Sequence, residues 1–204
     1  MLTAFATGFA TSISLILAIG AQNAFMLRQG LRREHVFELA LLFALSDAVL
    51  IAAGIVGFDI ATERFPLLPQ YLSWLGAAFL VIYGGLRFRA AWTGSGGMVA
   101  AGATAPLGTT LAVGAAFTWL NPHVYLDTLG LIGAISTGFQ GVQPKVAFAF
   151  GAIGASFVFF FSLGYGARFL APLMGSDRAW RVLDAGIGLT MWALAALLLA
   201  RPAA

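Results

Sequence analysis

The 204-residue chain contains no cysteine, only two histidines and few charged side chains, which make up 9% of its residues. The lack of cysteine excludes disulfides, thiolate metal sites and cysteine nucleophiles. The two histidines, His35 and His123, leave almost nothing for a zinc site. Soluble domains carry about 25% charged residues, whereas 60% of this chain is hydrophobic and its mean hydropathy is +0.92. The composition therefore indicates an integral membrane protein.

The charge balance is basic, with a net charge of +3 and a pI of about 9.8, yet it does not indicate a nucleic-acid partner. The arginines lie in short loops between apolar runs, which suits the surface of a lipid bilayer better. No charged side chain precedes Arg28, whereas a cleaved signal peptide has a basic region ahead of its apolar core. We therefore expect the N-terminal segment to be retained as a first membrane span.

Six apolar stretches approach the length of about 20 residues that a membrane-spanning helix needs. They cover roughly residues 3–26, 36–57, 68–88, 107–129, 145–167 and 181–200. The longest linker, residues 89–106, is rich in glycine and alanine and separates residues 1–88 from residues 107–204. The expected fold is an all-α integral membrane protein, with residues 1–204 forming one transmembrane transporter domain in two halves.

The two halves resemble one another. Asn23 and Asn121 are the only asparagines and lie 98 residues apart, near the same depth of spans one and four. Residues 45–57 resemble residues 154–166 at an offset of 109, which pairs Asp47 with Ser156. Because each half has an odd number of spans, the copies would lie in opposite orientations. This predicts two inverted three-helix repeats with broken helices one and four, a pattern typical of secondary transporters.

The lysines and arginines predict the orientation in the membrane, because cytoplasmic loops are rich in both. Eight lie in the first, third and fifth loops and three lie in the even loops and the C-terminal tail. The eight are Arg28, Arg32, Arg33, Arg87, Arg89, Arg168, Arg178 and Arg181, and the three are Arg64, Lys145 and Arg201. The odd loops are therefore expected in the cytoplasm and both termini outside.

The sequence TWLNPHVYLD (118–127) interrupts the fourth apolar stretch with a proline. Pro122 lacks an N–H and clashes with the preceding turn, so the helix should break or kink near Thr118. The freed backbone groups must be satisfied by neighbouring helices, by side chains or by water in a cavity. In the first half, Gly20, Gln22 and Asn23 occupy the corresponding place. A structural kink explains one such interruption, whereas two in matching positions indicate a substrate site.

Of the eight acidic residues, Asp47 lies within an apolar run, Asp127 and Asp184 lie nearer span ends, and the other five lie in or beside loops. A carboxylate at the depth of Asp47 costs at least about 2.5 kcal/mol, so we expect it to face a partner or a watery cavity. Asp127 lies nearer a span end, where a structural role is equally open. Asp184 follows Arg181 by three residues and is expected to form a surface pair with it. His123 would relay protons or form a structural hydrogen bond.

Enzyme motifs are missing from the sequence: there is no GxSxG, no HExxH and no phosphate-binding glycine loop. The dispersed glycines are better explained by close packing of membrane helices. The residues alone thus predict a small secondary transporter rather than an enzyme, with a non-transporting membrane scaffold as the alternative.

Residues 20–30, Asp47 and WLNPHVYLDT (119–128) resemble the lysine exporter (LysE) family of bacterial amino acid transporters, and within it the lysine/arginine exporters. The resemblance runs over essentially the whole chain. The wider superfamily usually has a proline in the first motif, where this chain has Ala21-Gln22-Asn23. The resemblance implies export of L-arginine or L-lysine across the bacterial inner membrane, driven by protons or the membrane potential, with no cofactor and no metal.

The substrate site implied by the residues and the resemblance together combines broken-helix backbone with polar side chains of both halves. Its expected binding residues are Gln22, Asn23, Asp47, Asn121, His123, Tyr125 and Asp127, and its helix breaks lie at Gly20 and Pro122. The amides would take the carboxylate of the substrate and Asp47 a cation. Export of neutral amino acids such as threonine or homoserine is the alternative, and the oligomeric state, a homo-oligomer included, is left open.

Overall fold

The computed structural model describes residues 1–17, 20–57, 68–94, 105–121, 124–125, 128, 131–174 and 176–200, and these residues form helices and no strand. The helices are α1 (Leu2–Ile16), α2 (Ala21–Arg32), α3 (Val36–Gly57), α5 (Leu68–Thr93), α7 (Leu107–Trp119), α9 (Ile132–Ser136), α10 (Val142–Gly166), the 3-10 helix η2 (Ala167–Met174) and α11 (Asp177–Ala200). The expected all-α class is confirmed.

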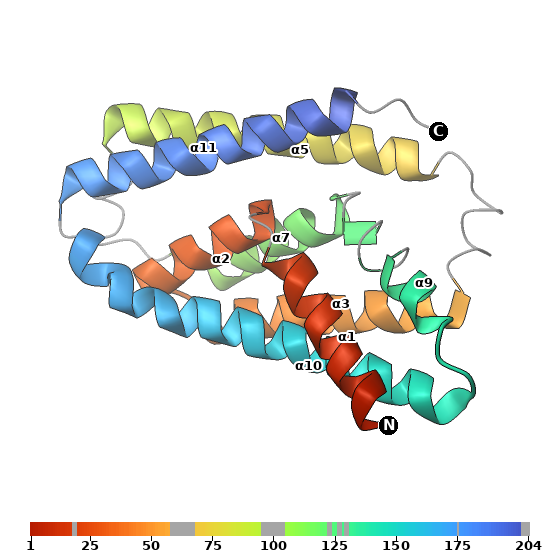
Figure 1. Cartoon of the computed structure of the whole chain (residues 1–204). Helices are drawn as coiled ribbons and strands as arrows, with labels where there is room; N and C mark the ends of the chain where they lie inside the picture. The colour runs from red at the N-terminus through yellow and green to blue at the C-terminus, as the bar shows by residue number, and fades with distance from the viewer. Residues whose placement is uncertain are drawn as a thin grey trace.

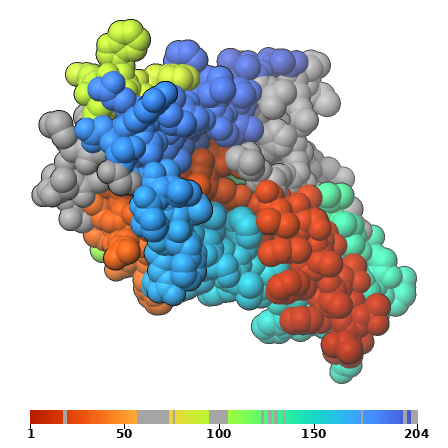
Figure 2. Space-filling model, turned by 60° about the vertical axis from the view of Figure 1, so that its left-hand side comes forward, coloured from red at the N-terminus to blue at the C-terminus, as the bar shows by residue number. Residues whose placement is uncertain are grey.

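The helices form layers. Helices α5 and α11 run side by side as one layer, while α3 and α10 pack together on the opposite side, with α2 and α7 between them (Figure 1). Helix α1 crosses α10, and Figure 2 shows the two in contact below α11. The start of α1 and the end of α11 lie toward the same end of the molecule (Figure 1). The layers meet in a core that includes Phe43, Phe117, Phe160 and Met191.

The first apolar stretch is broken, as the sequence predicts. Helix α1 ends at Ile16 and α2 starts at Ala21, and their directions differ by 82°. Gly20 precedes α2 in an extended conformation, with φ −110° and ψ 172°. The fourth stretch is also interrupted, because α7 ends at Trp119, close to the break expected near Thr118. Pro122 itself lies outside the described residues.

Two helices among the described residues are long and apolar enough to cross a membrane alone: Val36–Val56 and the continuous stretch Val142–Met174. The bent pair formed by α1 and α2 makes a third if it is counted as one span. A multi-pass membrane protein is thereby supported. Helix α5 continues to Thr93, into the linker expected from residue 89, and α11 starts at Asp177 rather than at 181.

Glycines allow α1 and α10 to approach until their backbones touch. A Cβ atom on Gly8 would meet the carbonyl oxygen of Phe148, and one on Gly151 would meet that of Phe5. Small residues at helix contacts are typical of membrane bundles, where close packing replaces the hydrophobic effect as the source of association. The dispersed glycines therefore serve packing here, as expected from the sequence.

Candidate functional site: two buried aspartates and an arginine-lined cavity

Asp47 lies in the middle of α3 and is buried, with 5% of its surface exposed. The hydroxyl of Ser156 on α10 donates a hydrogen bond to its Oδ2 at 2.7 Å. These are the two residues that the sequence comparison of the halves pairs at an offset of 109. No cation of the described residues forms an ion pair with Asp47. The buried carboxyl group therefore has a neutral partner only, which leaves it suited to take up a proton or a cation.

The polar residues at the first break have different surroundings. The side-chain amide of Asn23 donates to the carbonyl oxygen of Ile16 at 2.6 Å. That carbonyl belongs to the last turn of α1, where helical partners run out. Asn23 thus stabilises the break itself. The neighbouring Gln22 is 8% exposed, and its Nε2 has no hydrogen-bond partner in the described part of the chain.

The second break is bridged in a similar way. The hydroxyl of Tyr125 donates to the carbonyl oxygen of Trp119 at 2.8 Å, which satisfies the end of α7. Asn121 is half-buried just after α7, and its carbonyl oxygen accepts a hydrogen bond from the N–H of Val124. In both halves, a side chain beyond the break thus bonds to the helix before it. His123 and Asp127, like Pro122, lie outside the described residues and stay predictions.

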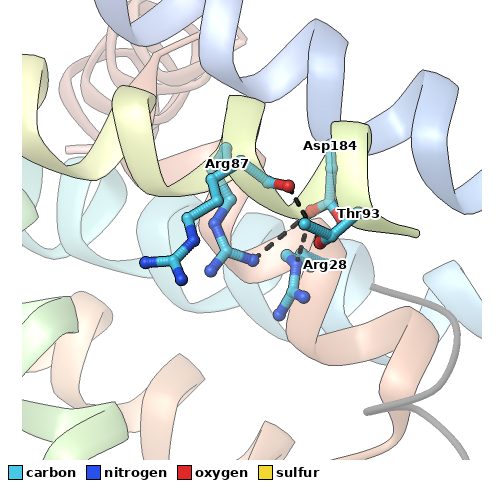
Figure 3. A network of polar contacts seen from close by, with 5 residues as sticks. Arg28, Arg87, Thr93 and Asp184 are labelled. Atoms are coloured by element: carbon cyan, nitrogen blue, oxygen red, sulfur yellow. Dashed lines mark hydrogen bonds and ion pairs between the residues drawn. The ribbon is translucent and has the colours of Figure 1, made fainter. Parts of the chain in front are cut away.

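Asp184 is not a surface residue, and its expected pairing with Arg181 is wrong. Its side chain is fully buried, and its Oδ1 accepts from Nε of Arg28 at 3.1 Å and from Nη1 of Arg87 at 3.4 Å. Figure 3 shows Arg28 and Arg87 on α2 and α5 converging on Asp184 of α11. The side chains of the two arginines are only 6% and 18% exposed. The face of α11 that carries Asp184 packs against α2 and α5, so the carboxylate points into the protein.

The sequence contains one indication that Asp184 is buried. Asp184 is followed by the apolar run AGIGL, and the same context singles out Asp47. The sequence predicts Arg28 in a loop because the first apolar stretch ends near residue 26, whereas α2 continues to Arg32. Only the packing of α11 on α2 and α5 brings the three charges together.

A cavity of about 200 Å³ lies between α2, α5 and α7. Its wall carries three guanidinium groups, three neutral polar side chains on α2 and α7, and aromatic rings. The lining residues are Phe25, Arg28, Gln29, Arg32, Tyr83, Arg87, Ala90, Ala105, Thr109, Thr110 and Val113. Phe117 packs against the Phe25 and Tyr83 rings at centroid distances of 5.2 and 4.8 Å. Sequence reasoning missed this cavity, because its arginines were assigned to the membrane surface.

The structure does not gather the expected site residues around this cavity. Gln22, Asn23, Asp47, Asn121 and Tyr125 are all absent from its described lining. Within the described residues, no group of three His, Asp or Glu side chains could hold a metal ion. Among the described residues, the arginine-lined cavity is thus a polar region separate from Asp47 and from the residues at the two breaks.

The long apolar helices and the bent pair formed by α1 and α2 are consistent with an integral membrane protein. A family model described as "LysE type translocator" matches residues 13–201. The chain therefore belongs to the LysE family of translocators, and the resemblance found in its sequence is confirmed.

The similar proteins of known name agree with this family. The chain is 43% identical over 201 residues to the arginine exporter protein ArgO of Yersinia enterocolitica, covering 96% of this chain and 95% of that protein. It is 41% identical over 200 residues to the arginine exporter protein ArgO of Salmonella typhimurium, covering 96% and 92%. The same values hold for the protein of that name from Salmonella paratyphi A. No solved structure matches the chain.

Proposed function

We propose that this protein exports basic L-amino acids, L-arginine and also L-lysine, from the cytoplasm across the bacterial inner membrane, by antiport driven by protons or the membrane potential. Relatives named arginine exporters, 41–43% identical along nearly the whole chain, support arginine as the substrate. The structural observation that carries the proposal is Asp47, a buried acid inside an apolar helix with only a hydroxyl group beside it.

The surroundings of Asp47 suit the exchange of a proton for a cation. A charged carboxylate in this environment is costly without a cationic partner. Protonation removes the charge, and an ammonium or guanidinium group of the substrate compensates it. Antiport requires a group that binds either the proton or the substrate cation, but not both at once. A single carboxyl group with a neutral neighbour meets this requirement. A neutral amino acid would leave the carboxylate dependent on protons alone.

Several contacts support the inverted repeat as the architecture of this transporter. Asp47 and Ser156, equivalent by sequence, touch each other, as residues beside a two-fold axis do. Gly30 of α2 packs against the backbone of Gly164 on α10, and Gly133 of α9 packs against the backbone of Gly54 on α3. Each of these two contacts joins a shorter helix of one half to a longer helix of the other half. With 26 and 24 residues, α5 and α11 are long enough to be spans three and six.

The two broken helices contact each other. Helices α2 and α7 are in contact, and the rings of Phe25 and Phe117 lie 5.2 Å apart. Polar residues flank this contact at the breaks. In this proposal Gln22, Asn23, Asn121, His123, Tyr125 and Asp127 bind the substrate together with Asp47. The Nε2 atom of Gln22 has no hydrogen-bond partner among the described residues, so it can donate to a ligand.

Counterflow in proteoliposomes tests the proposal. Vesicles loaded with unlabelled arginine should accumulate radiolabelled arginine, and lysine inside should also drive the exchange. Exchange with threonine or homoserine, but not with arginine, would instead assign a neutral amino acid exporter. A protein that exchanges no amino acid at all would be a scaffold.

The variant Asp47→Asn tests the residue that carries the proposal. It keeps the size and the hydrogen-bonding capacity with Ser156 but removes the charge, so the protein should insert normally and lose exchange by about tenfold or more. Ser156→Ala is the matched control, because it removes the hydrogen bond and keeps the carboxylate. Undiminished exchange by Asp47→Asn at all pH values would show that Asp47 has a structural role only.

A further inference from the structure

We propose that the arginine-lined cavity between α2, α5 and α7 binds the α-carboxylate end of the transported amino acid, with Arg28, Arg87 and Thr110 as donors. This inference rests on the proposed function and names the part of the substrate that this region recognises. A cationic substrate would be repelled by three guanidinium groups, so the cavity suits the one anionic group that every amino acid carries.

The arginines of the cavity differ from those that set the orientation in the membrane. Arg33, Arg89 and Arg181 are exposed, as expected of side chains that reach toward lipid head groups or water. The side chains of Arg28, Arg32 and Arg87 are instead 6%, 4% and 18% exposed. Burying a guanidinium group is costly, and an exposed arginine would serve orientation equally well. The burial of these three therefore needs a separate reason.

The charges around the cavity leave room for an anion. Asp184 neutralises part of the charge of Arg28 and Arg87, but both arginines share the same oxygen of this carboxylate. Arg32 pairs with Glu34 at 2.9 Å. In the described ion pairs, three arginines thus share two acids, and no carboxylate is among the described residues that line the cavity. Arg87 Nε has no hydrogen-bond partner in the described part of the chain, so a donor is left for a further acceptor.

Two buried neutral side chains also line the cavity. Thr110 is 2% exposed and Gln29 is 3% exposed, and both line the cavity. The Oγ1 atom of Thr110 and the Oε1 atom of Gln29 have no hydrogen-bond partner among the described residues. Buried polar atoms are nearly always hydrogen-bonded, so an unpaired donor and an unpaired acceptor in one cavity indicate a ligand. Thr110 can donate to a carboxylate, while Gln29 can accept from the α-ammonium group on the adjacent carbon.

The size and rigidity of the cavity fit one end of an amino acid. Its volume of about 200 Å³ is below the roughly 300–1,000 Å³ of pockets that enclose drug-sized ligands. The guanidinium carbon of Arg87 lies 5.1 Å from the centre of the Tyr83 ring, which holds it over an aromatic face. A donor held in place in this way loses less entropy on binding. The side chain of the substrate would extend beyond the cavity.

Competition by arginine analogues tests the inference in the counterflow assay. Agmatine is arginine without its carboxylate, and L-argininamide carries a neutral amide in its place. For the wild-type protein, arginine should inhibit exchange of labelled arginine at a concentration about ten- to a hundredfold lower than either analogue. In Arg87→Gln the ratio of the inhibitory concentrations of analogue and arginine should fall toward one, while the inhibitory concentration of agmatine stays unchanged. Arg89→Gln, two residues away on the same helix and exposed, should keep the wild-type preference.

Thr110→Val provides a second variant that should fold normally. It removes a hydroxyl group that has no hydrogen-bond partner among the described residues, so a purely structural role predicts no change. The carboxylate site instead predicts a several-fold loss of the preference for arginine over agmatine. Equal inhibition by arginine and agmatine in the wild-type protein would overturn the inference and leave export intact. Exchange that depends on chloride or phosphate in the buffer would also overturn the inference, because it would assign the cavity to an inorganic anion. Absence of any arginine exchange would refute the proposed function itself.

Discussion

At the scale of single residues, two buried aspartates have opposite surroundings. Asp47 accepts a hydrogen bond from a neutral hydroxyl, whereas Asp184 lies between two arginines. A carboxylate that is already paired with fixed cations gains little from a proton or a substrate. A carboxylate with only a neutral partner gains much from binding either a proton or a cationic substrate. This contrast is the reason for proposing that Asp47 couples transport and that Asp184 has a positioning role.

The structural role of Asp184 predicts a large loss of stability on its replacement. Asp184→Asn leaves Arg28 and Arg87 buried without a counter-charge, and breaking a buried pair in this way costs about 3–5 kcal/mol. The melting temperature in detergent should fall clearly below that of the wild type. Asp177→Asn, at the exposed first turn of the same helix, is the control and should melt near the wild-type temperature. Equal melting temperatures for both variants would show that the network contributes nothing to stability.

At the scale of helices, the contact between α1 and α10 depends on the absence of side chains. Gly8 and Gly151 each place their Cα hydrogens against the backbone of the other helix, at Phe148 and Phe5. A break in the first span makes this possible, because α1 is free to cross α10 in a direction 82° from that of α2. The extended backbone at Gly20 and the close packing at Gly8 thus together determine the directions of α1 and α2 on either side of the first break.

A pair of alanine substitutions on α10 separates packing from helix propensity. Gly151→Ala places a methyl group against the carbonyl oxygen of Phe5, so α1 must move, and overpacking of this kind costs about 1–3 kcal/mol. At Gly154 the added methyl group meets nothing within 4 Å. Both changes raise helix propensity equally. We therefore expect Gly151→Ala, but not Gly154→Ala, to lower the melting temperature and the exchange rate; the same behaviour of both would contradict the close contact.

At the scale of the whole molecule, the proposed six-span arrangement would place the two termini on one side of the membrane. The start of α1 and the end of α11 lie toward one end, while the junction of α2 and α3, the end of α5 and η2 lie toward the other (Figure 1). The second end carries most of the arginines. With the excess of positive charge in the cytoplasm, the arginine-lined cavity would lie on the side from which an exporter collects its substrate.

Single-cysteine labelling tests this orientation, because the chain has no cysteine of its own. A cysteine at the exposed Thr93, at the end of α5, should react with a membrane-impermeant reagent only from the cytoplasmic side. A cysteine at the exposed Gln140, between α9 and α10, should react only from outside. Reaction of both positions from the same side of intact cells would rule out the six-span arrangement with both termini outside.

The sequence by itself determined the class of protein, the approximate places of the helices and the two breaks. These features depend on local properties: runs of apolar residues that bury their own backbone polar groups, a glycine at residue 20, and a proline at residue 122. The LysE family was also recognisable, because its motifs are short and contiguous. The end of α2 was misplaced, since Arg28 and Arg32 look like loop residues when only neighbouring positions are considered.

Only the tertiary structure decided which charges are buried and with what partners. Ser156 beside Asp47, and Arg28 and Arg87 beside Asp184, are separated in sequence by 109, 156 and 97 residues. The surface pairing of Asp184 with Arg181 was the simplest local interpretation, and the packing of α11 on α2 and α5 replaced it. The arginine-lined cavity is likewise formed by three helices that no local pattern connects. Whether a charge meets lipid, water or a partner depends on the faces that helices turn toward each other, and these are chosen by the packing of the whole molecule.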